Sequence, residues 1–322
     1  MQTRCLAFGA AISLTLACGS NPAAPTAGAG LRIAADAVID LLPGESRALA
    51  VEPRDASGLT WTTSDPAIAT VEAGLLRAGQ QPGAVTITVM SASGATAVAH
   101  AVVQLPQHVP STYRITLVYS DEIPDSWKPA FQWAANRWQD VIRASLAPVD
   151  MASLPVRVKC PGLPDAMYTG LEHGTRIFVG RIDARFGSGG GPCAQRPGPR
   201  LTTAIGRVDV SYSTRGEDPE RLNGAFTLHE IGHVLGLVGV FDRDATPSWF
   251  DYEKQIFRGP FGLEGHRRDT GARAGSLEAQ GGHWHGLSDV MAVMNSSVTI
   301  SRASVGVLMD LGYPAAWYGG GF

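Results

Sequence analysis

One segment of the chain requires a helix that presents two histidines on the same side. Residues 226–237 read FTLHEIGHVLGL, in which His229 and His233 are four positions apart and Glu230 follows the first of them. On a helix, positions i and i+4 lie about 40° apart and one turn along the axis, so both imidazoles can bind one metal ion. The segment therefore predicts a buried helix with an HExxH metal site, and the rest of the fold has to supply further ligands.

Glu230 has the chemistry of a general base for a hydrolytic reaction. Its carboxylate lies beside the two histidine ligands, where it can accept a proton from a water activated by Zn²⁺. A structural zinc site is closed by four protein ligands and has no use for such a carboxylate. We therefore predict one catalytic zinc ion as the cofactor and Glu230 as the catalytic residue.

Gly236 predicts a sharp turn at the end of this helix, because glycine adopts positive φ without steric cost. Metzincin zinc peptidases use such a turn in the pattern HExxHxxGxxH to bring in their third ligand. In this chain the matching position is Gly239, which has no side chain that could coordinate a metal. The third ligand is therefore expected from another part of the chain.

Residues 111–322 resemble the leishmanolysin family of metzincins, in which a long insertion separates that glycine from the third histidine. The stretches that carry the resemblance are His229–Leu237, Phe257–Gly271, Gly281–Trp284, Asp289–Met291 and Ile300–Tyr313. The resemblance implies an α+β metzincin-like catalytic domain, made of a twisted sheet, the active-site helix and a C-terminal helical subdomain. It also implies a zinc-dependent endopeptidase that acts on protein or peptide substrates.

The same resemblance assigns two further site residues. His283, 50 residues beyond His233, takes the place of the third zinc ligand, and Met291 matches the Met-turn whose side chain forms an apolar floor under the ligands. Alternatives remain open at this stage. They are His285 as third ligand, Glu253 or Glu264 in a thermolysin-like arrangement, and Met294 at the Met-turn, whereas His266 is expected to be a surface residue.

Hydrophobic periodicity predicts further elements of this domain. Apolar residues at helical spacing indicate an amphipathic helix from about residue 126 to residue 145. Strands are predicted at residues 113–119, 156–159, 176–179 and 205–212. The last of these is expected to be the edge strand that pairs with an extended substrate, by analogy with metzincins. Residues 241–282 show little periodicity and are predicted to form a long functional loop.

Residues 31–104 predict a small all-β domain with an immunoglobulin-like sandwich. Short β-type runs at residues 61–63, 68–71, 85–89 and 97–103 are separated by Gly, Pro, Asp and Ser. Residues 59–89 resemble the bacterial group 2 immunoglobulin-like domain in their Trp-Thr-x-Ser-Asp-Pro, Ala-Thr-Val and Pro-Gly-x-x-x-Ile-Thr landmarks. Such domains are spacers or adhesion modules, so this resemblance implies no chemistry.

The N-terminus has the build of an export signal. Residues 1–17 combine Arg4 with an apolar run that ends in small residues, which is typical of a signal peptide, and Cys18 resembles the lipidated cysteine of a bacterial lipoprotein. Residues 18–30 are predicted to form a Pro/Ala/Gly tether. We therefore expect an exported protein, either lipid-anchored in the bacterial cell envelope or secreted. Cys160 and Cys193 remain as a predicted disulfide.

Charge excludes some partners. The formal net charge of −3 comes without long runs of one sign, so the chain has no electrostatic footprint for nucleic acid, and membrane contact is expected only through the lipid anchor. The protein is expected to act as a monomer. A second hypothesis from another functional class is a surface adhesion or binding lipoprotein whose metal site is structural or inactive.

Overall fold

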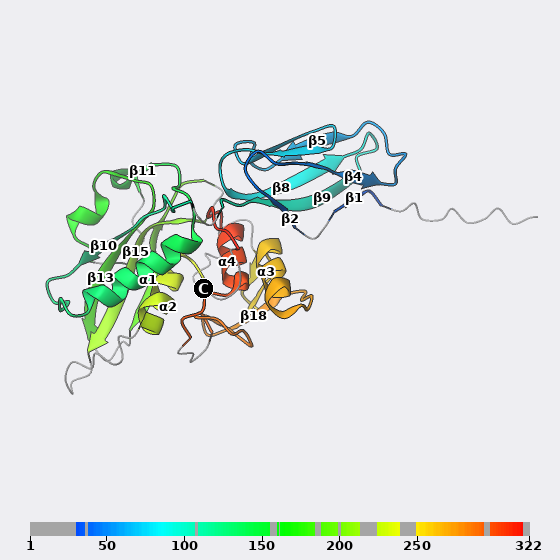
Figure 1. The fold of residues 1–322 in the computed structure, drawn as a ribbon. Coiled ribbons are helices and arrows are strands. Elements are labelled where there is room, and N and C mark those ends of the chain that lie inside the picture. The colour runs from blue at the N-terminus through cyan, green and yellow to red at the C-terminus, as the bar shows by residue number, and fades with distance from the viewer. Residues whose placement is uncertain are drawn as a thin grey trace, which may run out of the picture.

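The computed structural model describes residues 30–35, 38–106, 109–154, 160, 162–183, 188–198, 201–212, 224–238, 249–292 and 297–317. A β sandwich is followed along the chain by a mixed α/β region (Figure 1). No helix among these residues is both long and apolar enough to cross a membrane. The predicted signal peptide, Cys18, the tether up to residue 29 and the strand predicted at residues 156–159 lie outside the described residues.

The N-terminal region is an all-β sandwich, as predicted. A four-stranded sheet of order β2-β9-β8-β5 faces a three-stranded sheet of order β3-β7-β6, and β1 pairs with β4. Every second residue of β8 is buried, which is the period of a strand with one face on a core. The strands are β1 (Arg32–Ala34), β2 (Ile39–Leu41), β3 (Ser46–Ala48), β4 (Ala50–Glu52), β5 (Thr60–Thr63), β6 (Ala69–Glu72), β7 (Leu75–Ala78), β8 (Gly83–Met90) and β9 (Thr96–Val103).

A second four-stranded sheet, of order β10-β13-β15-β14, forms the frame of the C-terminal region. Its strands are β10 (Ile115–Tyr119), β13 (Thr175–Asp183), β14 (Gly189–Gln195) and β15 (Thr203–Tyr212). β10, β13 and β15 are parallel, whereas β14 runs antiparallel to β15 at the edge.

The prediction that residues 205–212 form the edge strand is wrong, because β15 lies between β13 and β14. β14, the edge strand next to β15, has the sequence GGGPCAQ, without the β-branched and aromatic residues that signal a strand. It is a strand only because it pairs with β15, and that long-range pairing is not visible in local propensity.

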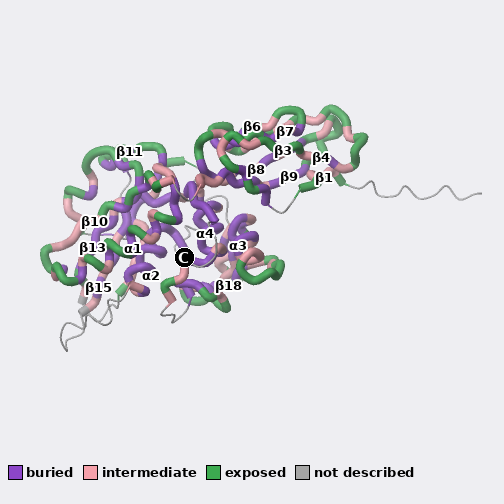
Figure 2. Tube along the Cα trace, in the orientation of Figure 1, coloured by how far each residue is buried: buried purple, intermediate pink, exposed green. Residues whose placement is uncertain are grey.

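Two helices, α1 (Lys128–Val141) and α2 (Gly224–Val234), pack together against one face of this sheet (Figures 1 and 2). The helix predicted at residues 126–145 is confirmed in type and is shorter at both ends. Trp138 of α1 is fully buried and its Nε1–H donates to the carbonyl oxygen of Leu228 at 2.8 Å. This bond fixes α1 against the helix that carries the HExxH motif.

The other face of the sheet is covered by residues between α1 and β13. They include β11 (Val149–Asp150), β12 (Leu171–Glu172) and the 3₁₀ turns Met151–Ser153 and Asp165–Tyr168. A disulfide joins Cys160 to Cys193 of β14, with a Cα–Cα distance of 5.6 Å, and both cysteines are buried in this second core. The disulfide therefore ties the edge strand to the layer beneath it.

We expect loss of this disulfide to lower the free energy of unfolding by about 4 kcal/mol, because it closes a loop across a sequence separation of 33 residues in the unfolded chain. Denaturant unfolding of the Cys160→Ser/Cys193→Ser double variant measures the change. Reduced wild-type protein should show the same loss, and an unchanged unfolding midpoint in both samples would contradict the prediction.

Residues 249–282 contain regular structure, although residues 241–282 were predicted to form a long loop. A small sheet of order β16-β17-β18-β19 is followed by a helix that packs on α3. The elements are β16 (Phe250–Asp251), β17 (Ile256–Phe257), α3 (Pro260–Thr270), β18 (Leu277–Gln280), β19 (His283–Trp284) and α4 (Arg302–Asp310).

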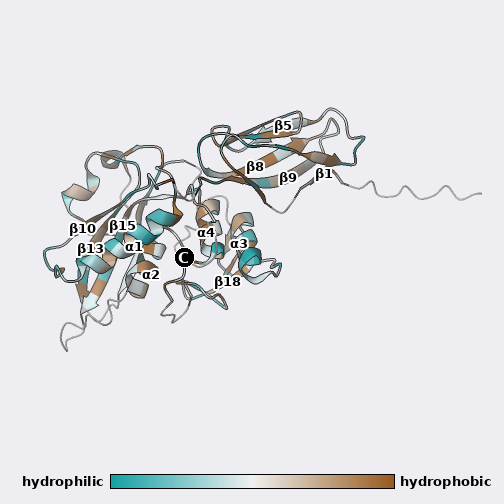
Figure 3. Ribbon diagram, in the orientation of Figure 1, coloured by the Kyte–Doolittle hydropathy of each residue, from teal (hydrophilic) through white to brown (hydrophobic). Residues whose placement is uncertain are grey.

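The N-terminus of α3 explains why the sequence did not reveal this helix. The carboxylate of Asp310, at the end of α4, accepts the backbone N–H groups of Phe261 at 3.2 Å and Gly262 at 2.8 Å. The residue that caps α3 is thus more than forty positions away in the sequence, whereas sequence signals for a helix start are local. α3 itself mixes apolar residues with arginines and glycines, seen as brown and teal segments in Figure 3.

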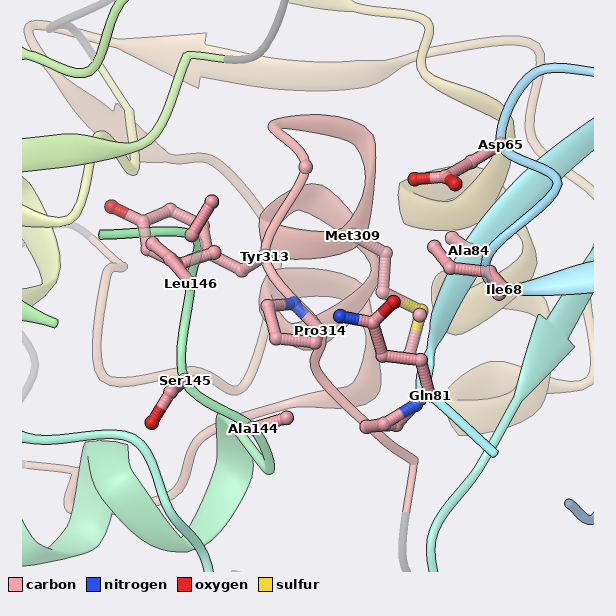
Figure 4. A pocket seen from close by; sticks show the side chains of 14 residues that line it. Asp65, Ile68, Gln81, Ala84, Ala144, Ser145, Leu146, Met309, Tyr313 and Pro314 are labelled. Carbon is pink, nitrogen blue, oxygen red and sulfur yellow. The ribbon is translucent and has the colours of Figure 1, made fainter. Parts of the chain in front are cut away.

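The sandwich packs directly on the C-terminal region. Val38 and Val102 belong to the same buried cluster as the residues of α1, α2 and α4. The ring of His100 meets the ring of Phe261 edge-on, with 5.5 Å between centroids. A cleft of about 190 Å³ separates the two regions beside this contact surface, with Ile68 on one wall and Tyr313 on the other (Figure 4).

Candidate metal centre

Three histidine side chains converge at the C-terminal region, two from α2 and one from β19. The metal-binding nitrogens available on His229, His233 and His283 all lie within 4.8 Å of one another, and Nε2 of His283 is 3.1 Å from Nε2 of His229. Among the described residues this is the group of His, Cys, Asp and Glu side chains that could hold a metal ion. The structure thus brings together the three residues that the sequence analysis named.

Backbone carbonyls orient the two histidines of α2. Nδ1 of His229 lies 2.7 Å from the carbonyl oxygen of Val290, and Nδ1 of His233 lies 3.0 Å from that of Leu237 and 3.1 Å from that of Val238. A carbonyl can only accept, so both Nδ1 atoms carry the hydrogen and both Nε2 atoms keep a lone pair. This is the tautomer that metal-binding histidines need.

Burial keeps these imidazoles neutral. It lowers the pKa of His229 and lowers the pKa of His233 to about 4, with the neighbouring His229 adding to the effect on His233. Neutral imidazole is the form that coordinates a metal. Three convergent nitrogen donors, two of them fixed in the required tautomer, fit a zinc ion in donor type and number.

The turn after α2 matches the prediction made for Gly236. This residue has φ of 99°, its N–H donates to the carbonyl oxygen of His233 at 3.0 Å, and the N–H of Leu237 donates to that of Gly232 at 3.0 Å. The pair of bonds is a Schellman motif, which requires the left-handed conformation at the residue just beyond the helix C-cap, here Gly236. The turn places the carbonyl groups of Leu237 and Val238 next to Nδ1 of His233. Gly239 lies outside the described residues.

Met291 packs against α2 between the two histidine positions. It is fully buried, and a Cβ atom added to Gly232 would lie 2.4 Å from its sulfur. Glycine at position 232 therefore leaves the room that Met291 occupies. Met294, the other residue considered for the Met-turn, lies outside the described residues.

Asp289 holds the segment that contacts both α2 and the strand of the third histidine. Its buried carboxylate accepts the backbone N–H groups of Met291 and Ser301, each at 2.7 Å, and the hydroxyl of Ser304 at 3.0 Å. The next residue, Val290, provides the carbonyl that orients His229. In the sequence, Asp289 stood out only as part of the stretch Asp289–Met291, and no role was predicted for it.

The strand that carries His283 is anchored to this same segment. The backbone N–H of Trp284 donates to the carbonyl oxygen of Met291 at 2.8 Å, and its indole N–H donates to the hydroxyl of Ser304 at 3.0 Å. The segment held by Asp289 is therefore connected to a histidine of α2 on one side and to the strand of His283 on the other.

We expect Asp289→Asn to weaken zinc binding about tenfold, because partners of this kind around metal ligands contribute 10- to 100-fold in affinity. The amide would turn an N–H₂ group toward a backbone N–H. A competition titration with a chromogenic chelator measures the affinity. Asp310→Asn is the matched control, since its carboxylate also accepts two backbone N–H groups but caps α3. An unchanged zinc affinity in Asp289→Asn would contradict the role of this carboxylate.

Glu230 directly follows His229 on α2 and is not part of the group of three histidines. Its side chain is buried, and Oε2 has no hydrogen-bond partner among the described residues. Burial raises its pKa to about 7, opposed by a hydrogen bond from the backbone N–H of Gly190 in β14. An unpartnered buried carboxylate oxygen has a free-energy cost, so it points to a group that is bound there in function.

The alternative third ligands lie elsewhere. His285 is exposed beyond the end of β19 and faces Glu278 at 3.5 Å. Glu264 lies on α3 and is bonded to two arginines of that helix, Arg267 and Arg268. His266 is on the same helix and Glu253 is exposed. None of the four joins the group of three histidines.

Each similarity to known proteins covers part of this chain. No curated protein matches the chain. Among solved structures, a C-terminal fragment of intimin in complex with the intimin-binding domain of its translocated receptor is 23% identical, over 34% of this chain and 39% of that chain, with a TM-score of 0.20. The SGBP-B protein of the mixed-linkage glucan utilization locus of Bacteroides ovatus, in complex with a heptasaccharide, is 18% identical over 28% of this chain and 29% of that chain, also at 0.20.

This chain therefore spans less than half the length of either structure. The family model for the bacterial Ig-like domain (group 2) matches residues 41–102, which run from the last residue of β2 through β3 to β8 and all but the last residue of β9. Together with the two-sheet topology, this match identifies residues 41–102 as a bacterial Ig-like domain of group 2.

Proposed function

We propose that this protein is an exported zinc-dependent endopeptidase whose C-terminal domain is of the leishmanolysin-like metzincin type. The observation that carries the proposal is the convergence of His229, His233 and His283, together with Glu230, which follows His229 on α2 and has a buried carboxylate oxygen without a partner among the described residues. The Schellman turn at Gly236 and the buried Met291 add support, since both match features that the resemblance to metzincins implies.

In this proposal the three histidines hold the zinc ion through Nε2. When bound, zinc supplies a Lewis acid that lowers the pKa of a water and polarises the scissile carbonyl. Glu230 accepts the proton of the attacking water and delivers it to the leaving amine. Val290, Leu237 and Val238 keep the histidines of α2 in the tautomer that coordination requires.

The edge strand β14 is the proposed place for the substrate backbone. It pairs with β15 on one side, and its Gly190 donates an N–H to Glu230. An extended peptide added to the free edge of a sheet forms main-chain hydrogen bonds that hold it in register. A peptide bound in this way would lie close to the proposed base. Pairing with the substrate is therefore proposed for β14, residues 189–195, in place of residues 205–212.

Export is proposed from the signal-like residues 1–17, with lipidation of Cys18 as the anchor and a secreted form as the alternative. The bacterial Ig-like domain of group 2 at residues 41–102 supports a place at the bacterial surface. In this arrangement the Ig-like domain lies between the anchor and the catalytic domain.

The second candidate function is a surface adhesion or binding protein with a structural or inactive metal site. The Ig-like domain favours it, because such domains serve as adhesion modules or spacers. Glu230 distinguishes the two, since a structural site gains nothing from a buried carboxylate without a partner.

Metal analysis together with cleavage of a panel of denatured proteins tests the proposal. We expect about one zinc ion per chain and fragments that disappear when a chelator is added and return with zinc. Zinc binding without cleavage of any protein in the panel would favour the adhesion candidate. Cleavage that a chelator does not affect would contradict the zinc mechanism.

A further inference from the structure

A second site of different character lies between the Ig-like domain and α3, on residues that the proposed peptidase does not use. It is a cleft of about 600 Å³, which is within the range of small-molecule binding sites. Its polar lining contains four arginines and two acids: Arg47, Arg267, Arg268, Arg273, Asp40 and Glu264. We call these six residues the arginine cleft.

The charges in the arginine cleft do not balance. Four guanidinium groups against two carboxylates leave a net charge of +2. Both carboxylates already bond Arg268, Asp40 at 2.7 Å and Glu264 at 2.8 Å, and Glu264 also bonds Arg267. Both acids are therefore paired with arginines of the cleft, and the surplus positive charge remains.

Arg47 and Arg273 carry this surplus from opposite sides. Arg47 lies on β3 of the Ig-like domain with half of its side chain exposed, and its ion pair with Glu45 is long, at 3.8 Å. Arg273 follows α3, is exposed, and has no hydrogen bond or ion pair with any of the described residues. Each can therefore offer its fork of N–H donors to a ligand.

The interior of the cleft is held rigid. Arg268 is fixed by Asp40, by Glu264 and by the ring of Trp317, whose centroid is 4.1 Å from its guanidinium carbon. Because Asp40 belongs to the Ig-like domain and Glu264 to α3, this arginine connects the two walls. The two walls are therefore connected before a ligand binds, which lowers the entropic cost of binding.

We propose that the arginine cleft binds an oxyanion with two or more negative charges, of the phosphate or polycarboxylate class, between the two domains. Guanidinium groups match both chemistries, because their paired N–H donors bond two oxygens of one anion at once. The two negative charges of such an anion would offset the net charge of +2 in the cleft. Since one arginine comes from each domain, the anion stabilises their docking.

Calorimetric titration of the full chain at constant ionic strength tests the proposal, with inorganic phosphate in one arm and citrate in the other. We expect saturable binding of one anion per chain in at least one arm, and the arm that binds more tightly identifies the class. Arg47→Ala and Arg273→Ala should each weaken binding about tenfold, since each removes one charge-assisted contact. The same anion should raise the melting temperature of the wild-type chain.

Arg77→Ala is the matched control, because Arg77 is an exposed arginine of β7 that does not line the cleft. It should bind as tightly as the wild type. Equal affinity in all three variants would overturn the proposal, because binding would then come from general surface charge. Absence of binding in both arms would overturn it as well.

Discussion

Glu230→Gln should retain zinc and lose hydrolysis by a factor of about 10² to 10⁴, the range for removal of a general base. The amide preserves the shape of the side chain and cannot accept the proton of the attacking water. The carboxylate does not belong to the group of metal-binding nitrogens, so zinc content should stay at the wild-type level. Zinc analysis and initial rates on one substrate from the panel measure both quantities.

Glu253→Gln provides the control for this variant, because it makes the same chemical change at an exposed position outside the site. It should leave both zinc content and rate unchanged. Near wild-type hydrolysis by Glu230→Gln, still sensitive to a chelator, would show that another group acts as the base.

His283→Ala should lower zinc stoichiometry and hydrolysis together. Two histidines on α2 cannot close a zinc site, and His283 is the third nitrogen donor in the group. Because the imidazole of His283 is only partly buried, its removal should disturb folding little. Zinc titration, metal analysis and thermal unfolding distinguish a metal defect from a folding defect.

His285→Ala and His266→Ala are the matched controls and should keep zinc in place. His285 is exposed and faces Glu278, while His266 lies on α3. Wild-type zinc affinity in His283→Ala, with loss of zinc in either control variant, would move the third ligand to the corresponding position.

Some features of the candidate site are predictable because they are local. The spacing of His229 and His233 and the turn at Gly236 lie within eight residues, so helical geometry and the conformational freedom of glycine are enough to derive them. The position of His283 could not be derived in this way. It was inferred from a family resemblance, because His283 lies 50 positions beyond His233 and most of the intervening segment shows no clear periodicity.

β14 and α3 show why other elements of the fold could not be predicted from the sequence. β14 is a glycine-rich segment that becomes a strand through pairing with β15, and α3 takes its cap from Asp310 at the end of another helix. In both cases the stabilising hydrogen bonds come from residues distant in sequence, whereas propensities and capping signals report only on neighbours.

The sequence by itself determined the helix with its two histidines and base, the turn that ends it, and the alternating strands of the Ig-like domain. Each of these depends on the 3.6- or 2-residue period of a single segment. Only the tertiary structure decided which strand forms the sheet edge, how Asp289 holds the segment under the histidines, and that arginines of two domains share one cleft. These features depend on contacts between segments far apart in the chain, whose geometry no local pattern encodes.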